Sequence, residues 1–148
     1  MTKNLKLLVA AAALVVCTAM PAMAQVSEAT SLTAQAIKDL TDYPGLGKRY
    51  TAYKSPEDMT KFWGADVSVM KKATATLQDG LGKARSGNVG KAGIDQLEMA
   101  IRFCAGSMQK ECRLSAQGAL YYLCQGGGAE ANKEACEKVP RYGSYVAP

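Results

Sequence analysis

Apolar residues recur at alternating steps of three and four along most of this chain, which is the spacing of an amphipathic α-helix. No segment alternates apolar and polar residues over the length of a strand, and no turn dipeptide separates two β-branched runs. The pattern therefore predicts an all-α fold, a small antiparallel bundle of about five helices. The clearest stripe consists of Ile94, Leu97, Ile101, Cys104 and Met108.

Residues that start and stop helices divide the rest of the chain. Ser55 and Pro56 are a typical cap and first helical residue, and Gly64 is expected to end or bend the helix that follows them. Gly126-Gly127-Gly128 is expected to terminate another helix as a flexible connection. The predicted helices are 27–42, 55–63, 66–86, 94–108, 114–125 and 129–139, with a loop over 48–54.

The N-terminus has the pattern of a cleavable secretion signal. Lys3 and Lys6 precede an uncharged run of about 13 residues, too short for the roughly 20 residues of a membrane-spanning helix. Pro21 is expected to break any helix, and Ala22-Met23-Ala24 has the small residues of a cleavage site before Gln25. We expect residues 1–24 to be the signal peptide, 25–140 a single helical domain, and 141–148 a loose C-terminal tail.

A lipid anchor at Cys17 is the competing interpretation of this region. Leu14-Val15-Val16-Cys17 loosely imitates the site at which lipoproteins are cut and acylated, but Val16 is too large for its position. We therefore expect an exported protein without a transmembrane span. The sequence does not distinguish a periplasmic from a secreted location.

The other four cysteines, Cys104, Cys112, Cys124 and Cys136, predict two disulfides in the C-terminal half, because exported chains usually oxidise an even set of thiols. Cys112 and Cys124 would lie about 18 Å apart along a helix, too far to bridge. Cys104 and Cys112 flank a predicted turn, and Cys124 can reach Cys136 around the triple glycine. We favour these two pairs.

The chain contains no histidine. Ser-His-Asp and Cys-His nucleophile systems, His-rich metal sites and haem attachment through Cys-x-x-Cys-His are thereby excluded. No Cys-x-x-Cys spacing occurs either, so we expect no metal or other cofactor. Without Lys3 and Lys6 the net charge falls from +5 to +3, and we expect no specific nucleic-acid partner.

Cations and aromatic rings interleave in one part of the chain, before and within the helix that begins at Pro56. Such a surface could bind a protein or an anionic envelope polymer, since rings supply contact area and cations supply attraction. The alternative is that the rings pack on the core while the charges stay solvated. The candidate binding residues are Lys48, Arg49, Tyr50, Tyr53, Lys54, Lys61, Phe62 and Trp63.

Three functions remain open from the sequence. The leading hypothesis is a non-catalytic binding or accessory protein of the cell envelope. The alternatives are a small hydrolase or lyase that uses carboxylates without histidine, and a lipid-binding helical protein that uses the face of Met59, Phe62 and Trp63. No pair of carboxylates stands out as a general acid and base among Glu57, Asp58, Asp66, Asp95 and Glu98.

Overall fold

The computed structural model describes residues 2–42 and 56–137, with side chains described for 22–42 and 67–137. These residues contain no strand, so the predicted all-α class is confirmed. The long helices are α1 (Thr2–Asp42), α3 (Pro56–Ser86), α4 (Lys91–Ala105) and α5 (Gln109–Leu123). A π-helical turn, η2 (Cys124–Gly128), leads into two short helices, α6 (Ala129–Ala131) and α7 (Lys133–Glu137).

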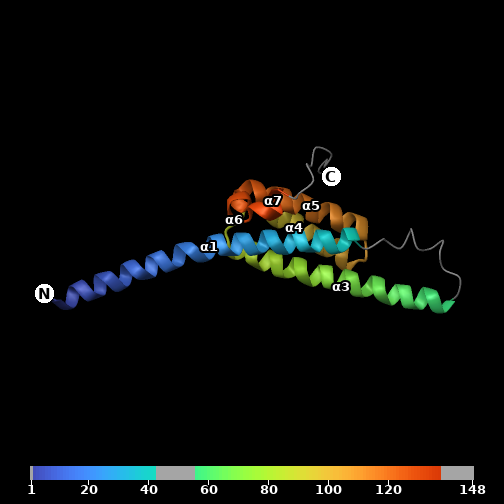
Figure 1. Cartoon of the computed structure of the whole chain (residues 1–148), viewed down its shortest axis with the longest axis horizontal. Helices are drawn as coiled ribbons and strands as arrows, with labels where there is room; N and C mark the ends of the chain where they lie inside the picture. Colours follow the sequence, from blue (N-terminus) through green and yellow to red (C-terminus); the bar gives the residue numbers. More distant parts are fainter. Residues whose placement is uncertain (1, 43–55, 138–148) are drawn as a thin grey trace.

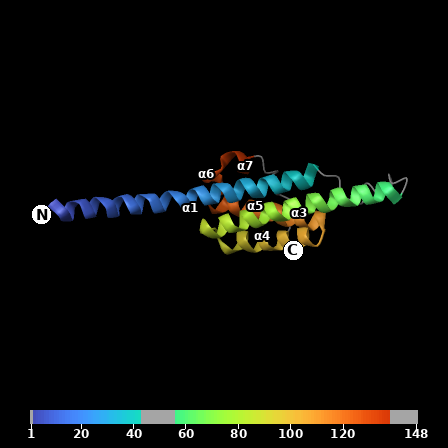
Figure 2. The same ribbon diagram turned by 90° about the horizontal axis from the view of Figure 1, so that it is seen from below.

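The four long helices form an antiparallel bundle in which each packs on the next along the chain and α5 packs back on α1 (Figures 1 and 2). Helices joined by short connections become antiparallel neighbours in this way. At one end of the bundle, the side-chain amide of Gln109, the first residue of α5, donates a hydrogen bond of 2.9 Å to the carbonyl of Leu40 near the end of α1. The ends of α1 and α5 are thereby tied together.

The core of the bundle is built from small and medium side chains at heptad-like spacing. In α3 the buried residues Met70, Ala73, Leu77, Gly80 and Ala84 alternate by steps of three and four. The same alternation places buried residues on α1, α4 and α5, which is the stripe that left-handed helix bundles require. The fully or almost fully buried large side chains are those of Leu40, Leu77, Leu97 and Leu123.

Small residues let the backbones of α1 and α3 approach closely. A methyl group at Gly80 would lie 3.5 Å from the hydroxyl of Thr33, in ordinary contact. At Gly87, directly after α3, a methyl group would lie 2.8 Å from a methyl of Val26 and 3.1 Å from its backbone nitrogen. Ion pairs border the same seam, between Lys83 and Glu28 at 2.7 Å and between Lys72 and Asp39 at 3.1 Å.

Two predicted helix breaks are absent. α1 continues through Pro21, and α3 continues through Gly64, so both predictions were wrong. A glycine inside a helix costs only about 1 kcal/mol relative to alanine, which the buried stripe further along α3 outweighs. A proline removes one intrahelical hydrogen bond, and the helical turns on either side of Pro21 keep theirs. The first helix consequently begins at Thr2, well before the predicted start at Ser27.

Met108 was assigned to the apolar stripe of its helix, and this was wrong. α4 ends at Ala105, Ser107 adopts a left-handed φ of 58°, and Met108 is 45% exposed in the turn before α5. The disulfide between Cys104 and Cys112 flanks this turn and buries both cysteines in the core. Because α4 ends three residues before Met108, this residue does not join the stripe.

The predicted helix over 129–139 is interrupted at Asn132, which separates α6 from α7. Asn132 has non-helical backbone angles (φ −146°, ψ 76°). Its side-chain oxygen accepts a hydrogen bond of 3.1 Å from the amide of Ala135. This is the geometry of a helix N-cap, so Asn132 begins α7. Before it, Gly127 has a φ of 106°, which confirms the triple glycine as a helix terminator. The predicted tail, 141–148, lies outside the described residues.

Candidate functional site

The predicted binding surface lies entirely outside the part of the chain whose side chains are described. Lys48, Arg49, Tyr50, Tyr53 and Lys54 lie outside the described residues altogether. Lys61, Phe62 and Trp63 lie on α3, whose backbone is described there. The structure thus places the backbone of three of the eight predicted residues on a helix, and the predicted surface itself stays untested.

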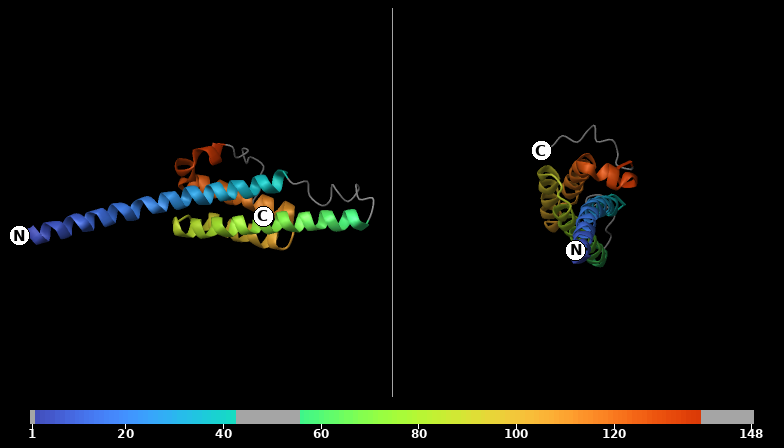
Figure 3. Two further views of the ribbon diagram at one scale, coloured as in Figure 1. Left: turned by 60° about the horizontal axis from the view of Figure 1, so that its bottom comes forward. Right: turned by 90° about the vertical axis from the view of Figure 1, so that its left-hand side faces the viewer.

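The first turns of α3 reach past the ends of α1, α4 and α5, as Figures 1 and 2 and the left view of Figure 3 show. Residues 56–69 precede Met70, the first buried residue described on α3, and correspond to about 21 Å of helix. We call residues 56–66 the α3 arm. Lys61, Phe62 and Trp63 therefore stand on a helix that leaves the bundle.

The heptad register of α3 continues into the α3 arm. Trp63 lies one heptad before the core residue Met70, and Met59 lies four residues before Trp63. Phe62 occupies the position next to Trp63, and Asp66 interrupts the stripe with a charge where the arm meets the bundle. The register that buries Met70 against neighbouring helices thus places apolar residues where no described helix lies beside α3.

The other projecting segment is the N-terminal part of α1, which leaves the opposite end of the bundle (Figure 1). Val26 is the first residue of α1 that is described as buried, whereas Met23 is 59% exposed and Ala24 is exposed. Among the α1 side chains that are described, those from 22 to 42, the buried ones therefore begin at Val26, two residues after Ala24 and just beyond the predicted cleavage position.

Two of the carboxylates considered as catalytic groups are engaged in surface ion pairs. Asp95 accepts a hydrogen bond of 2.5 Å from Lys91, and Glu98 accepts one of 2.5 Å from Arg85. The hydrogen bond to Asp95, together with its negative charge, raises the pKa of Lys91 above its ordinary value. Asp95 thus pairs with a lysine of its own helix, α4, and Glu98 pairs with an arginine of the neighbouring helix α3. The side chains of Glu57, Asp58 and Asp66 are not among those described.

The disulfides are the most completely defined chemical groups of the chain, and both predicted pairings are confirmed. Cys104 and Cys112 have their Cα atoms 5.0 Å apart and join α4 to α5. Cys124 and Cys136 have theirs 5.7 Å apart and join η2 to α7. Among the side chains that are described, no group of three or more cysteine, aspartate or glutamate residues is placed to hold a metal ion.

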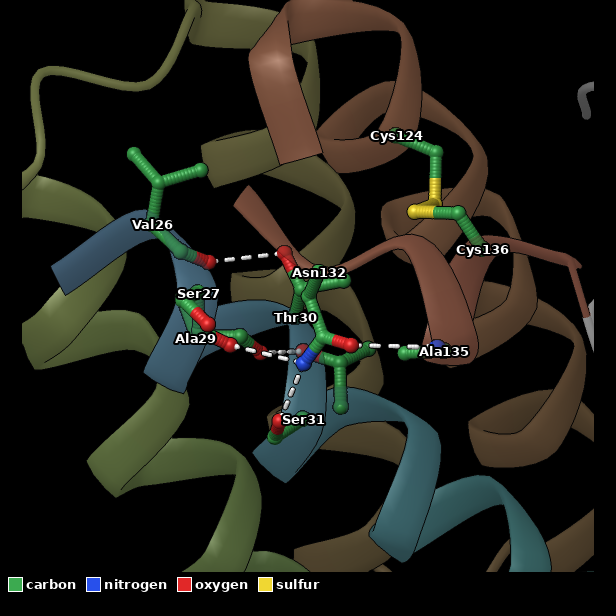
Figure 4. Close-up of a disulfide and its surroundings, with 10 residues drawn as sticks. Val26, Ser27, Ala29, Thr30, Ser31, Cys124, Asn132, Ala135 and Cys136 are labelled. Atoms are coloured by element: carbon green, nitrogen blue, oxygen red, sulfur yellow. Dashed lines mark hydrogen bonds between the residues drawn. A yellow bond between two sulfur atoms is a disulfide. The ribbon is translucent and has the colours of Figure 1, made fainter. Parts of the chain in front are cut away.

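Asn132 organises a polar contact that the sequence did not single out. Its side-chain nitrogen donates to the carbonyl of Ser27 at 3.3 Å and to the hydroxyl of Ser31, both on α1 (Figure 4). Because its oxygen caps α7, one side chain joins the C-terminal helix to the first. The sequence signal for the cap is an asparagine directly before a short helical segment, since asparagine is a favoured N-cap residue. Its partners on α1 depend on the tertiary fold and have no such signal.

No helix in the described part of the chain combines the length and apolarity needed to cross a bilayer. Comparison with known protein families, with curated proteins and with solved structures finds no match to this chain.

Proposed function

We propose that this chain is an exported, disulfide-stabilised helical protein that binds a partner in the cell envelope, with residues 1–24 as its secretion signal and residues 25–140 as its working domain. The α3 arm is the proposed contact site. Its partner would be a protein that presents an amphipathic helix with acidic flanks. The periplasm and the medium are both compatible with this role.

The observation that carries the proposal is the continuation of the apolar stripe of α3 beyond the bundle. Helices pair through such stripes when each buries residues at steps of three and four against the other. Met59, Phe62 and Trp63 hold these positions in the α3 arm, and aromatic residues in particular supply much of the binding energy in protein interfaces. Lys61 between them, and Lys48, Arg49 and Lys54 before the helix, would attract acidic groups on the partner.

Two further observations support export. Val26 is the first residue of α1 that is described as buried, so loss of residues 1–24 would remove none of the described core residues. The two disulfides each close a short loop, for which the loss of unfolded-state entropy amounts to roughly 2.5 to 3 kcal/mol. Structural disulfides of this kind persist in oxidising compartments.

The test is capture of a partner from envelope extract by the oxidised protein, compared with three variants. The first carries Phe62→Ser and Trp63→Ser on the α3 arm. The second carries Lys48→Ser, Arg49→Ser, Tyr50→Ser and Tyr53→Ser. The control carries Leu114→Ser and Tyr121→Ser, which are each 38% exposed on α5, away from the arm.

We expect the parent and the control variant to capture the same protein and the α3-arm variant to lose it. The second variant separates a contribution of 48–53 from that of the helix. Equal capture by all four proteins would contradict the α3 arm as the site. Binding of the parent to anionic lipid vesicles, with loss in the α3-arm variant and no captured protein, would favour the lipid-binding alternative instead.

A further inference from the structure

The two disulfides differ in their exposure to solvent. Cys104 and Cys112 are 1% and 0% exposed, inside the core between α4 and α5. Cys124 and Cys136 are both partly exposed. Figure 4 shows the disulfide that joins them. A reductant can therefore approach the second disulfide in the folded protein, whereas the first requires the bundle to open.

The segment that the exposed disulfide holds, α6 and α7, lies at the surface of the bundle. Neither α6 nor α7 contains a buried residue. Its described contacts with α1 include the hydrogen bonds of Asn132 to Ser27 and Ser31, and Cys136 joins it to η2 through the disulfide. Hydrogen bonds at exposed positions contribute little net stability, because water competes for the same groups.

The chain before α6 is fixed independently of the disulfide. Gly128, the last residue of η2, is buried, and a methyl group there would lie 2.9 Å from the hydroxyl of the fully buried Thr30. η2 is thus packed on α1 through the close approach of the Gly128 backbone to the Thr30 side chain. The boundary between the packed bundle and the surface segment lies between Gly128 and Ala129.

We propose that the Cys124–Cys136 disulfide is a redox-sensitive latch that a dithiol reductant opens in the folded protein, releasing α6 and α7 from α1. A thiolate of the reductant attacks one of the two sulfurs, forms a mixed disulfide and expels the other cysteine as a thiolate. The second thiol of the reductant then attacks the mixed disulfide. Two electrons and two protons pass from the dithiol, which becomes a disulfide, to Cys124 and Cys136.

Opening of the latch uncovers the polar strip of α1 around Ser27 and Ser31, which the Asn132 amide covers in the oxidised protein. The Cys104–Cys112 disulfide and the four-helix core stay intact during this step. The proposal concerns the opposite end of α3 from the α3 arm, so it stands or falls separately from the proposed binding function.

The test is time-resolved alkylation of the oxidised full-length chain in dithiothreitol, with peptide mass analysis of each cysteine. We expect Cys124 and Cys136 to become alkylated together, at least about tenfold faster than Cys104 and Cys112, because their reduction needs only local access. In the singly reduced protein, backbone amides of 133–137 should lose hydrogen-exchange protection while those of α4 and α5 keep theirs.

Reduction of both disulfides at one rate, or of Cys104–Cys112 first, would overturn the proposal. Retained protection of 133–137 after selective reduction would overturn the release of the segment. The variant with Cys124→Ser and Cys136→Ser provides a second measurement, since it should show the same loss of protection without any reductant.

Discussion

The side-chain amide of Asn132 donates a hydrogen bond to the backbone carbonyl of Ser27, 105 positions earlier in the chain. The same side chain accepts a hydrogen bond from the amide of Ala135. One asparagine thus both begins α7 and attaches it to α1. The two roles use different atoms of the amide, so they can be separated by substitution.

Asn132→Asp should keep the cap of α7 and lose the link to the Ser27 carbonyl, because a carboxylate accepts hydrogen bonds and cannot donate one. Asn132→Ala should lose both, with a cost to the segment of about 1 kcal/mol for the cap alone. Hydrogen exchange at the amide of Ala135 distinguishes the two. Equal protection of this amide in Asn132→Ala and in the parent would contradict its role as the cap.

The glycines of α3 and its end offer a matched pair. Gly87→Ala should destabilise the protein by about 1 to 3 kcal/mol, because the new methyl group would collide with Val26. Gly82→Ala should stabilise it by about 0.5 to 1 kcal/mol, since nothing lies within 4 Å of the added methyl group and alanine favours the helix. Urea unfolding measures both; a stabilising Gly87→Ala would show that α1 and α3 do not approach closely there.

Leu77 lies fully buried in the middle of the α3 stripe. Leu77→Ala should cost about 2 to 5 kcal/mol, the range for a buried leucine whose cavity does not collapse. Leu114→Ala, at a position that is 38% exposed, should change the free energy of unfolding by less than about 0.5 kcal/mol. A similar loss of unfolding free energy in the two variants would contradict the assignment of Leu77 to the core and of Leu114 to the surface.

The two disulfides should differ in their effect on global stability. Replacing Cys104 and Cys112 by alanine should lower the free energy of unfolding by at least about 2.5 kcal/mol, because the cross-link lies inside the bundle. Replacing Cys124 and Cys136 should cost less, since α7 can detach locally while the bundle remains folded. Thermal unfolding of the two double variants gives the comparison, and an equal loss would argue that α7 unfolds together with the bundle.

Much of the fold followed from the spacing of apolar residues, and the disulfide pairing from simple distance limits along a helix. Cys104 and Cys112 were assigned correctly because they flank a short connection between two predicted helices. Gly64 and Met108 were misassigned because local residue preferences compete with burial of a long stripe and with a turn that a disulfide flanks. Pro21 was misassigned because a helix with hydrogen-bonded turns on both sides tolerates the loss of one hydrogen bond. The close approach of Gly87 to Val26 and the contact of Asn132 with Ser27 depend on which helices become neighbours.

From the sequence, the candidate site could be predicted only as a stretch in which aromatic and cationic residues interleave, without its position in the fold. Its position on a projecting helix depends on the lengths of α3 and of its neighbours, since the α3 arm exists where α1, α4 and α5 have ended. Trp63 resembles a core residue by its spacing, and the sequence alone left open whether it is buried in the core or lies on the surface. Trp63 has the spacing of a core residue because it lies one heptad before the buried Met70, in the same stripe of α3. It lies on the α3 arm because that stripe continues beyond the bundle.

The central claim, an exported bundle closed by two disulfides, is tested most directly by the mass of the protein recovered from the envelope fraction and the medium of cells that express the full chain. We predict an N-terminal peptide that begins at Gln25 and a mass four hydrogens below that of the reduced chain, with Cys104 linked to Cys112 and Cys124 linked to Cys136. A protein that retains residues 1–24, or one whose four cysteines are free thiols, would contradict the account.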